Sequence, residues 1–316
     1  MADDLFERLL QGGRRAEEVQ AALTARFGAG AEVAQVLKLG TDSAVFAGVF
    51  QGQDAVFKQF FTPDAAQILA RMSEELLYLD GALGQGAYRV NRLLTTLPEA
   101  GLAVLEKAPG QRLSKLIKSD DPDARGRSIA LAANWLATVA PLRAQQKRLG
   151  GTRMARQLEG LNLEALPPED RQLSLALLAA LKRFGKRIRG GDLTHTVAHG
   201  DFAPVNMMSD GQTIWAVDIQ GGARFPLARI MARFLVAKDL YAHRQVPRKW
   251  GLDADDLHVF TDAQILPMPE LQSALPYFVG QQFLRRFVTS YPDRAGPPNA
   301  RARLAECLSE LETACH

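Results

Sequence analysis

The hydrophobic pattern of this chain changes its period near residue 31, and this change limits the available folds more than any other feature. Before it, apolar residues recur at helical spacing, and the GlyGly pair at residues 12 and 13 is expected to divide that region into two helices. Residues 32–61 instead alternate apolar and polar side chains, with glycines at the expected turns. This segment predicts three antiparallel strands in a meander.

The remaining pattern predicts a short β-rich region followed by a long helical one. A helix is expected over residues 64–83, where apolar residues step by three and four. Strands are expected at 88–94 and 102–106, helices at roughly 122–148, 169–189, 226–242, 254–264, 269–290 and 300–314, and a strand-rich insert at 196–220. We therefore expect an α+β fold with a β-rich lobe over residues 1–106 and a helical lobe over residues 107–316.

Charge and cysteine content exclude several classes of protein. The chain has 316 residues, enough for two domains, and its 38 Lys and Arg against 35 Asp and Glu leave too little charge to imply a nucleic-acid partner. No apolar run approaches the ~18 residues that span a bilayer, and the N-terminus lacks the pattern of a secretory signal. Cys307 and Cys315 would lie roughly 12 Å apart on one helix, too far to pair. We expect a cytoplasmic protein with neither membrane nor nucleic-acid partners.

The most informative polar residues lie in the strand-rich insert. His199, Gly200 and Asp201 are followed by Asn206, and Asp218 ends an apolar strand. A turn at residues 209–211 is expected to fold this strand back and bring Asn206 and Asp218 side by side. Amide and carboxylate oxygens suit Mg²⁺, which takes substrate phosphates as further ligands. The spacing is therefore typical of phosphoryl transfer.

The segment HGDFAPVN, followed by VDIQ, resembles the catalytic and metal-binding motifs of the aminoglycoside phosphotransferase and choline kinase family, distant relatives of the protein kinases. The resemblance implies a bilobal protein-kinase-like fold that moves the γ-phosphate of Mg·ATP to a hydroxyl of a small molecule. It implies that Asp201 orients or deprotonates this hydroxyl and that Asn206 and Asp218 bind Mg²⁺. His199 would brace the loop.

The same resemblance assigns roles to residues of the β-rich region. Lys58, in the third expected strand, would contact the nucleotide phosphates, and Glu75 on the next helix would hold it. Glu75 flanks the apolar stripe of this helix, whereas Glu74 points to its far side. A solvated lysine and a solvated carboxylate are the alternative interpretations.

Two further segments match nucleotide-binding parts of the family. Gly40 and Ser43 resemble the turn that covers the phosphates, where backbone amides bind. The residues from Glu106 to Ala108 resemble the connector whose backbone meets adenine. A plain hairpin is the alternative for the first segment.

The sequence also departs from the family pattern. Gln220 stands where many relatives carry a second acid, and Arg229 stands where relatives have an aspartate that braces the catalytic loop. Either some other group braces this loop or the loop is looser than in relatives. These departures favour a rival hypothesis, a nucleotide-binding pseudokinase with a regulatory role. A third possibility is a protein that shares the fold but has no nucleotide site.

The acceptor is expected to be an amino sugar, an amino alcohol or a sugar, bound by the helical region after residue 226 and especially by residues 251–290. The acidic stretch 253–256 could attract a cationic amine, or it could begin a helix. The helix start is the favoured interpretation.

Overall fold

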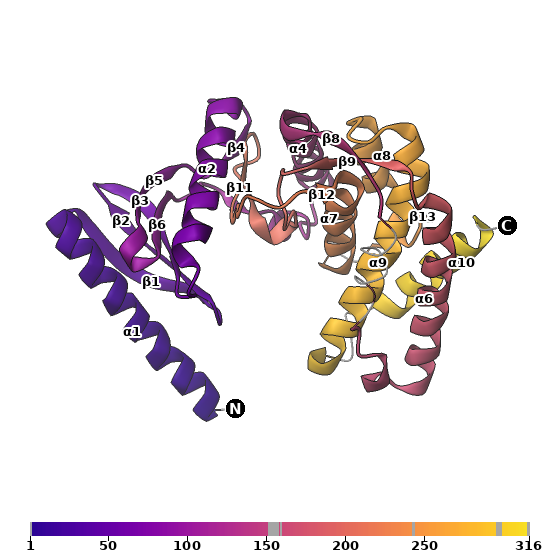
Figure 1. The fold of residues 1–316 in the computed structure, drawn as a ribbon, viewed down its shortest axis with the longest axis horizontal. Helices are drawn as coiled ribbons and strands as arrows, with labels where there is room; N and C mark the ends of the chain where they lie inside the picture. Colours follow the sequence, from indigo (N-terminus) through magenta and orange to yellow (C-terminus); the bar gives the residue numbers. More distant parts are fainter. Residues whose placement is uncertain (1, 151–157, 159, 242–243, 295–298, 315–316) are drawn as a thin grey trace. The chain divides into compact units, whose positions relative to one another are not determined.

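The computed structural model describes residues 2–150, 158, 160–241, 244–294 and 299–314 (Figure 1). The chain divides into two compact units. The first contains Met1–Pro109 together with Trp215–Gly222, and the second contains Gly110–Ile214 and Ala223–His316. No helix in these described ranges is long and apolar enough to cross a membrane.

The first unit is built on a five-stranded antiparallel sheet with strand order β1-β2-β3-β6-β5. Its elements are α1 (Ala2–Phe27), β1 (Ala31–Leu39), β2 (Ser43–Phe50), β3 (Gln53–Phe60), α2 (Ala65–Leu83), β4 (Tyr88–Val90), β5 (Leu93–Leu97) and β6 (Leu102–Glu106). The predicted three-stranded meander and the helix after it are thus confirmed.

Helix α1 packs on one face of this sheet. Its buried residues Val19 and Leu23 belong to one core with Phe46 and Phe57 of the sheet. Because side chains alternate along a strand, Lys58, the residue after Phe57, points to the opposite face of the sheet. The expected break in the N-terminal helix is wrong, since α1 is continuous. A helical glycine costs only about 1 kcal/mol, and burial of the apolar stripe outweighs it.

The strand expected over residues 88–94 is split in the structure. β5 belongs to the main sheet, whereas beside β4 the backbone N–H of Asn91 donates to the carbonyl of Ala216. Residues Trp215–Gly222 therefore return to the first unit after the chain has formed much of the second. This return sets the position of Asp218.

The second unit is mainly helical. Its longer elements are α4 (Pro122–Val139), α6 (Pro168–Ile188), α7 (Leu227–Tyr241), α8 (Ala254–Asp262), α9 (Met268–Arg294) and α10 (Ala300–Thr313), and its short ones are β7 (Gln111–Arg112), α3 (Leu113–Leu116), β8 (Gln145–Arg148), β9 (Asp192–Thr196), β10 (Met207–Ser209), β12 (Phe225–Pro226), β13 (Arg248–Lys249) and β14 (Leu252–Asp253). β11 (Ile214–Ala216) spans the boundary between the units. The expected helices are confirmed, except that the helix expected over residues 122–148 is shorter in the structure. It ends at Val139, because Pro141 cannot donate to a helical carbonyl, and Gln145–Arg148 form a strand paired with β9.

A row of aromatic rings joins the helices of this unit to the loop after β9. Trp135 of α4 stacks on Phe202 with ring centroids 5.7 Å apart, and Phe202 stacks on Phe234 of α7 at 4.7 Å. Phe260 of α8 continues the row at 5.2 Å from Phe234. The loop that carries Asp201 is therefore attached to rigid, buried helices.

Candidate functional site

The loop between β9 and β10 is stabilised by its own polar groups. The backbone N–H of Asp201 donates to Nδ1 of His199 at 3.3 Å, and Nδ2 of Asn206 donates to the carbonyl of Asp201 at 2.9 Å. His199 is only 1% exposed and lies edge-on to Trp135. The loop thus holds Asp201 and Asn206 in a fixed relation, with His199 as a buried support.

The carboxylate of Asp201 forms an ion pair with Arg233 of α7. The Asp201 side chain is 42% exposed and that of Arg233 is 28% exposed, so both reach the surface of this unit. Arg233 is not among the residues predicted from the sequence. The available signal was its position, one helical turn after Arg229 and therefore on the same face of α7.

Asn206 has an amide oxygen available for a ligand. Its amide nitrogen is held by the Asp201 carbonyl, and within the described residues its oxygen accepts no hydrogen bond. The side chain is half-buried. An amide held through its nitrogen in this way presents its oxygen in one direction.

In the first unit, Lys58 and Asp218 lie together. The Lys58 side chain is 7% exposed and forms an ion pair with Oδ1 of Asp218, whose side chain is 27% exposed. The ammonium also lies 4.9 Å from the ring centroid of Phe60. Asp218 has φ of 64°, in the left-handed region that non-glycine residues seldom adopt. The backbone around this carboxylate is therefore strained.

Helix α2 presents Glu75 to the interior and Glu74 to solvent. Glu75 is 2% exposed and lies among the buried residues of the helix. Gly221 lies against it: a side chain at Gly221 would place Cβ 3.0 Å from Cβ of Glu75 and 2.6 Å from the carbonyl oxygen of Arg71. The segment after Asp218 is thus packed on α2. The pairing of Glu75 with Lys58 stays a prediction.

The other residues expected at a nucleotide site lie at strand ends of the first unit. The N–H of Gly40 donates to the carbonyl of Ser43 at 2.9 Å, which closes the turn between β1 and β2. Glu106 pairs with Arg92, with 2.9 Å between Oε2 and Nε, and its backbone N–H donates to the carbonyl of the same arginine. Ala108 is 8% exposed, and within the described chain its N–H donates no hydrogen bond.

The structure therefore groups the expected site residues by unit. Asp201 and Asn206 are together in the second, and Lys58 and Asp218 are together in the first. The adjacency of Asn206 and Asp218 remains a prediction.

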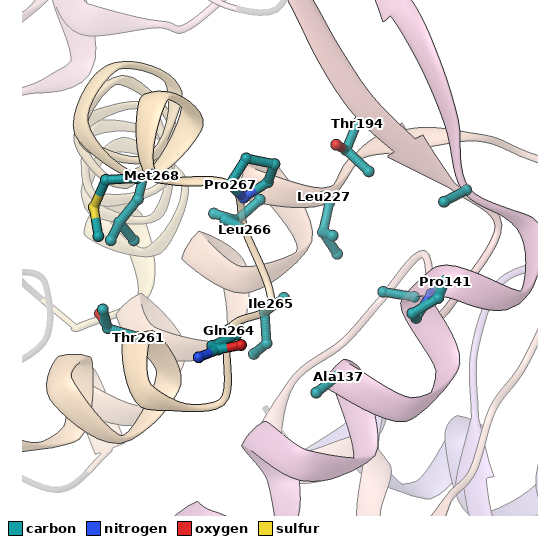
Figure 2. Close-up of a pocket in the computed structure, with 13 residues that line it drawn as sticks. Ala137, Pro141, Thr194, Leu227, Thr261, Gln264, Ile265, Leu266, Pro267 and Met268 are labelled. Atoms are coloured by element: carbon teal, nitrogen blue, oxygen red, sulfur yellow. The ribbon is translucent and has the colours of Figure 1, made fainter.

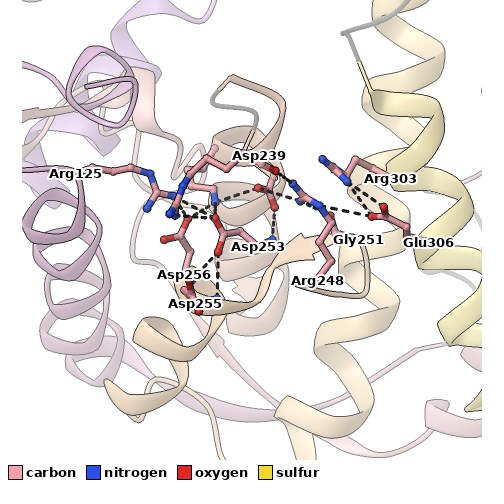
Figure 3. Close-up of polar contacts among 11 residues, drawn as sticks. Arg125, Asp239, Arg248, Gly251, Asp253, Asp255, Asp256, Arg303 and Glu306 are labelled. Carbon is pink, nitrogen blue, oxygen red and sulfur yellow. Dashed lines mark hydrogen bonds and ion pairs between the residues drawn. The ribbon is translucent and has the colours of Figure 1, made fainter. Parts of the chain in front are cut away.

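The acidic stretch at residues 253–256 is a helix start, as favoured from the sequence. Asp253 caps α8 by accepting from the N–H groups of Asp255 and Asp256 at 3.1 and 3.3 Å. Asp253 and Asp256 are buried, and both are paired with Arg125 and with Lys238, which is fully buried (Figure 3). The protein's own cations occupy Asp253 and Asp256, whereas Asp255 is exposed, and a site for a cationic amine at this stretch stays a prediction.

These charges belong to a larger buried network. Asp239 pairs with Lys238 and accepts from the N–H of Asp253 at 2.9 Å, while Arg248 lies 3.7 Å from Asp239 and 3.9 Å from Glu306 (Figure 3). Burial acts to raise the pKa of Asp253, but Lys238, the N–H of Asp256 and Arg125 together hold that pKa below its usual value. The network connects α4, α7, α8 and α10.

The second unit also contains a cavity of about 560 Å³ with no charged side chain in its lining (Figure 2). It is lined by Ala137, Ala140, Pro141, Ala144, Thr194, Leu227, Thr261, Gln264, Ile265, Leu266, Pro267, Met268 and Leu271. The stretch from Thr261 to Leu271 falls in the region expected to bind the acceptor. The lining is apolar apart from two threonines and one glutamine.

Comparisons with known proteins agree with this architecture. A model of the phosphotransferase enzyme family matches residues 33–217. The solved structure of aminoglycoside phosphotransferase APH(4)-Ia is similar with a TM-score of 0.62 and 13% identity, over 93% of this chain and 99% of that one. A choline/ethanolamine kinase family protein from Mesorhizobium loti gives 0.59 and 15%, over 95% of this chain and 99% of that one.

Amicoumacin kinase hAmiN, solved in complex with AMP-PNP, Ca²⁺ and Ami, gives a TM-score of 0.58 and 17% identity, over 94% of this chain and 96% of that one. No curated protein matches the sequence. The structural likenesses show an α+β protein-kinase-like fold.

Proposed function

The chain belongs to the phosphotransferase enzyme family, and from this premise we propose that it moves the γ-phosphate of Mg·ATP to a hydroxyl of a small molecule. The observation that carries the proposal is the ion pair between buried Lys58 and Asp218. A desolvated ammonium beside a strained, partly exposed carboxylate is a suitable arrangement for phosphate and metal binding. Solved relatives of this fold hold AMP-PNP.

The nucleotide would be bound by residues of the first unit. Lys58 would contact the α and β phosphates and Glu75 would help to hold it, while backbone amides of the turn between Gly40 and Ser43 would cover the phosphates. Ala108 is a buried residue, and its N–H, which donates to no group in the described chain, would donate to adenine beside Glu106.

The donor atoms fit Mg²⁺. Asn206 offers an amide oxygen that accepts no hydrogen bond from the described residues. Asp218 offers a carboxylate on a residue whose backbone φ is 64°. Both are hard oxygen donors, the ligands that this ion prefers. When bound with ATP, the metal ion would neutralise part of the negative charge of the phosphates.

Asp201 would act on the acceptor. Its carboxylate is 42% exposed on a loop held by Asn206 and His199, so a hydroxyl from solvent can reach it. The hydroxyl oxygen forms a bond to the γ-phosphorus as the bond to the bridging oxygen of ADP breaks, and the hydroxyl proton passes to Asp201. The uncharged cavity of Figure 2 is our candidate for the acceptor's apolar part.

The test compares Asp201→Asn with Asp192→Asn, which changes an exposed aspartate of β9 in the same unit. Transfer of labelled γ-phosphate is measured across amino sugars, amino alcohols and sugars, and Mg·ATP binding is measured by thermal stabilisation. We expect Asp201→Asn to lower turnover by about 10²- to 10⁴-fold. It should keep the stabilisation of about 2.7 kcal/mol expected at ~100 times the dissociation constant.

Three results would contradict the proposal. Equal turnover in both variants would remove Asp201 as the catalytic group. Nucleotide binding by the unmodified chain without transfer to any acceptor would favour the pseudokinase. Absence of stabilisation by Mg·ATP would show that there is no nucleotide site.

A further inference from the structure

We propose that Arg233 positions Asp201 and makes the acceptor site favour neutral or anionic hydroxyl compounds over cationic ones. This inference rests on the proposed function, because it assumes that Asp201 faces the acceptor. Arg233 lies on α7 and pairs with Asp201 on the loop after β9.

Two adjacent contacts join α7 to this loop. Arg233 binds Asp201, and the next residue of the helix, Phe234, stacks on the next residue of the loop, Phe202, with ring centroids 4.7 Å apart. The stacked pair is fully buried and fixes the register between helix and loop. Arg233 therefore approaches Asp201 from a rigid element, and this double contact supplies the brace that the sequence lacks at Arg229.

The geometry of Arg233 leaves its charge at the surface beside the carboxylate. Its Nε is buried without a hydrogen-bond acceptor, so within the described chain its terminal nitrogen makes the contact with Asp201. The side chain is still 28% exposed. An acceptor that reaches Asp201 from solvent would meet a guanidinium, which repels ammonium groups and donates hydrogen bonds to hydroxyl or carboxylate oxygens.

Other charges of the second unit agree with this selectivity. Asp253 and Asp256, two of the three aspartates in the acidic stretch 253–256, are buried against Arg125 and Lys238. The lining of the cavity in Figure 2 is uncharged. Neither these two aspartates nor the cavity lining presents a free negative charge to the ammonium groups of an amino sugar.

The experiment measures kcat and KM for matched acceptors that differ in charge: glucose, glucosamine and gluconate, and glycerol, 3-amino-1,2-propanediol and glycerate. The variants are Arg233→Gln, Arg233→Lys and Arg233→Glu. Arg301→Gln, which removes an exposed arginine paired with Glu169, is the control. If no acceptor is phosphorylated, the ratios are taken from inhibition of basal Mg·ATP hydrolysis.

We expect the unmodified chain and Arg233→Lys to favour the neutral acceptor of each matched set over the cationic acceptor. Arg233→Gln should reduce the ratio of kcat/KM for the neutral acceptor to kcat/KM for the cationic acceptor about tenfold, because KM for the cationic acceptor falls. Arg233→Glu should reverse the preference. The KM for ATP should not change. In the unmodified chain, raising the ionic strength from 0.01 to 1 M should weaken the preference, a readout that needs no variant to fold.

Two results would overturn the inference while leaving the proposed function intact: a ratio of kcat/KM between neutral and cationic acceptors that Arg233→Gln leaves unchanged, or a preference for cationic acceptors in the unmodified chain. Failure of the proposed function would appear separately, as full turnover in Asp201→Asn.

Discussion

Lys58 and Asp218 form an ion pair across a sequence separation of 160 residues. The lysine comes from the third strand of the first unit, and the aspartate comes from the segment that returns to that unit after Ile214. The lysine side chain is only 7% exposed, and the Asp218 carboxylate supplies a negative charge beside its ammonium. The pair is therefore the part of the candidate site where substitution is most informative.

Lys58→Met should reduce kcat/KM for ATP by about 10²-fold or more, because one preorganised positive charge at the phosphates is lost. The measurement is steady-state kinetics at varied ATP with the acceptor held constant. Arg14→Met is the control, since it removes an exposed positive charge from α1 in the same unit. Equal effects of the two substitutions would argue against a nucleotide role for Lys58.

Gly221→Ala should destabilise the protein by about 1 to 3 kcal/mol and weaken ATP binding. Gly221 has φ of 70°, and the added Cβ would meet the Arg71 carbonyl oxygen at 2.6 Å. Gly13→Ala should instead stabilise the protein by about 0.4 to 1 kcal/mol, because this helical position has open space around it. Urea denaturation and ATP titration measure both effects. An unchanged affinity for ATP in Gly221→Ala would show that the segment after Asp218 has no role in nucleotide binding.

Asp253 should make the stability of the second unit fall in acid. Its folded pKa is held below its usual value, chiefly by Lys238 acting against the effect of burial. The stabilisation is then present above the unfolded pKa of about 3.9 and is lost as pH falls through the folded pKa. Asp253→Asn should be less stable at pH 7 and should lose less stability between pH 5 and pH 3. Urea denaturation at each pH gives the comparison, and parallel curves for the two proteins would contradict it.

Ala137→Phe should raise KM for the acceptor by about tenfold if the cavity of Figure 2 holds part of it, because the added ring would fill space between α4 and the segment Thr261–Leu271. Asn134→Phe adds the same ring on an exposed position of α4 and should leave KM unchanged. Isothermal titration with the acceptor gives an independent affinity. A normal KM in Ala137→Phe would place the acceptor elsewhere.

Much of the fold follows from local sequence signals. Alternating residues around Phe46 and Phe57 predicted the meander, and the apolar stripe of α2 placed Glu75 on its buried face. The cap at Asp253 predicted the start of α8. These features depend on residues close together in the chain, where periodicity and capping act directly.

The errors and omissions depend on distant contacts. The continuity of α1 through Gly12 comes from its burial against the sheet, which no local propensity reports. Pairing of Gln145–Arg148 with β9 joins segments separated by the whole of α6. Arg233 was missed for the same reason, because its contact with Asp201 depends on how α7 packs on the loop.

The first unit is assembled from two separate stretches of sequence, Met1–Pro109 and Trp215–Gly222. A fragment truncated at Pro109 would retain Lys58 but leave its ammonium without Asp218. Exchange of this unit between homologues must therefore transplant both stretches, because a single crossover point would separate Lys58 from Asp218.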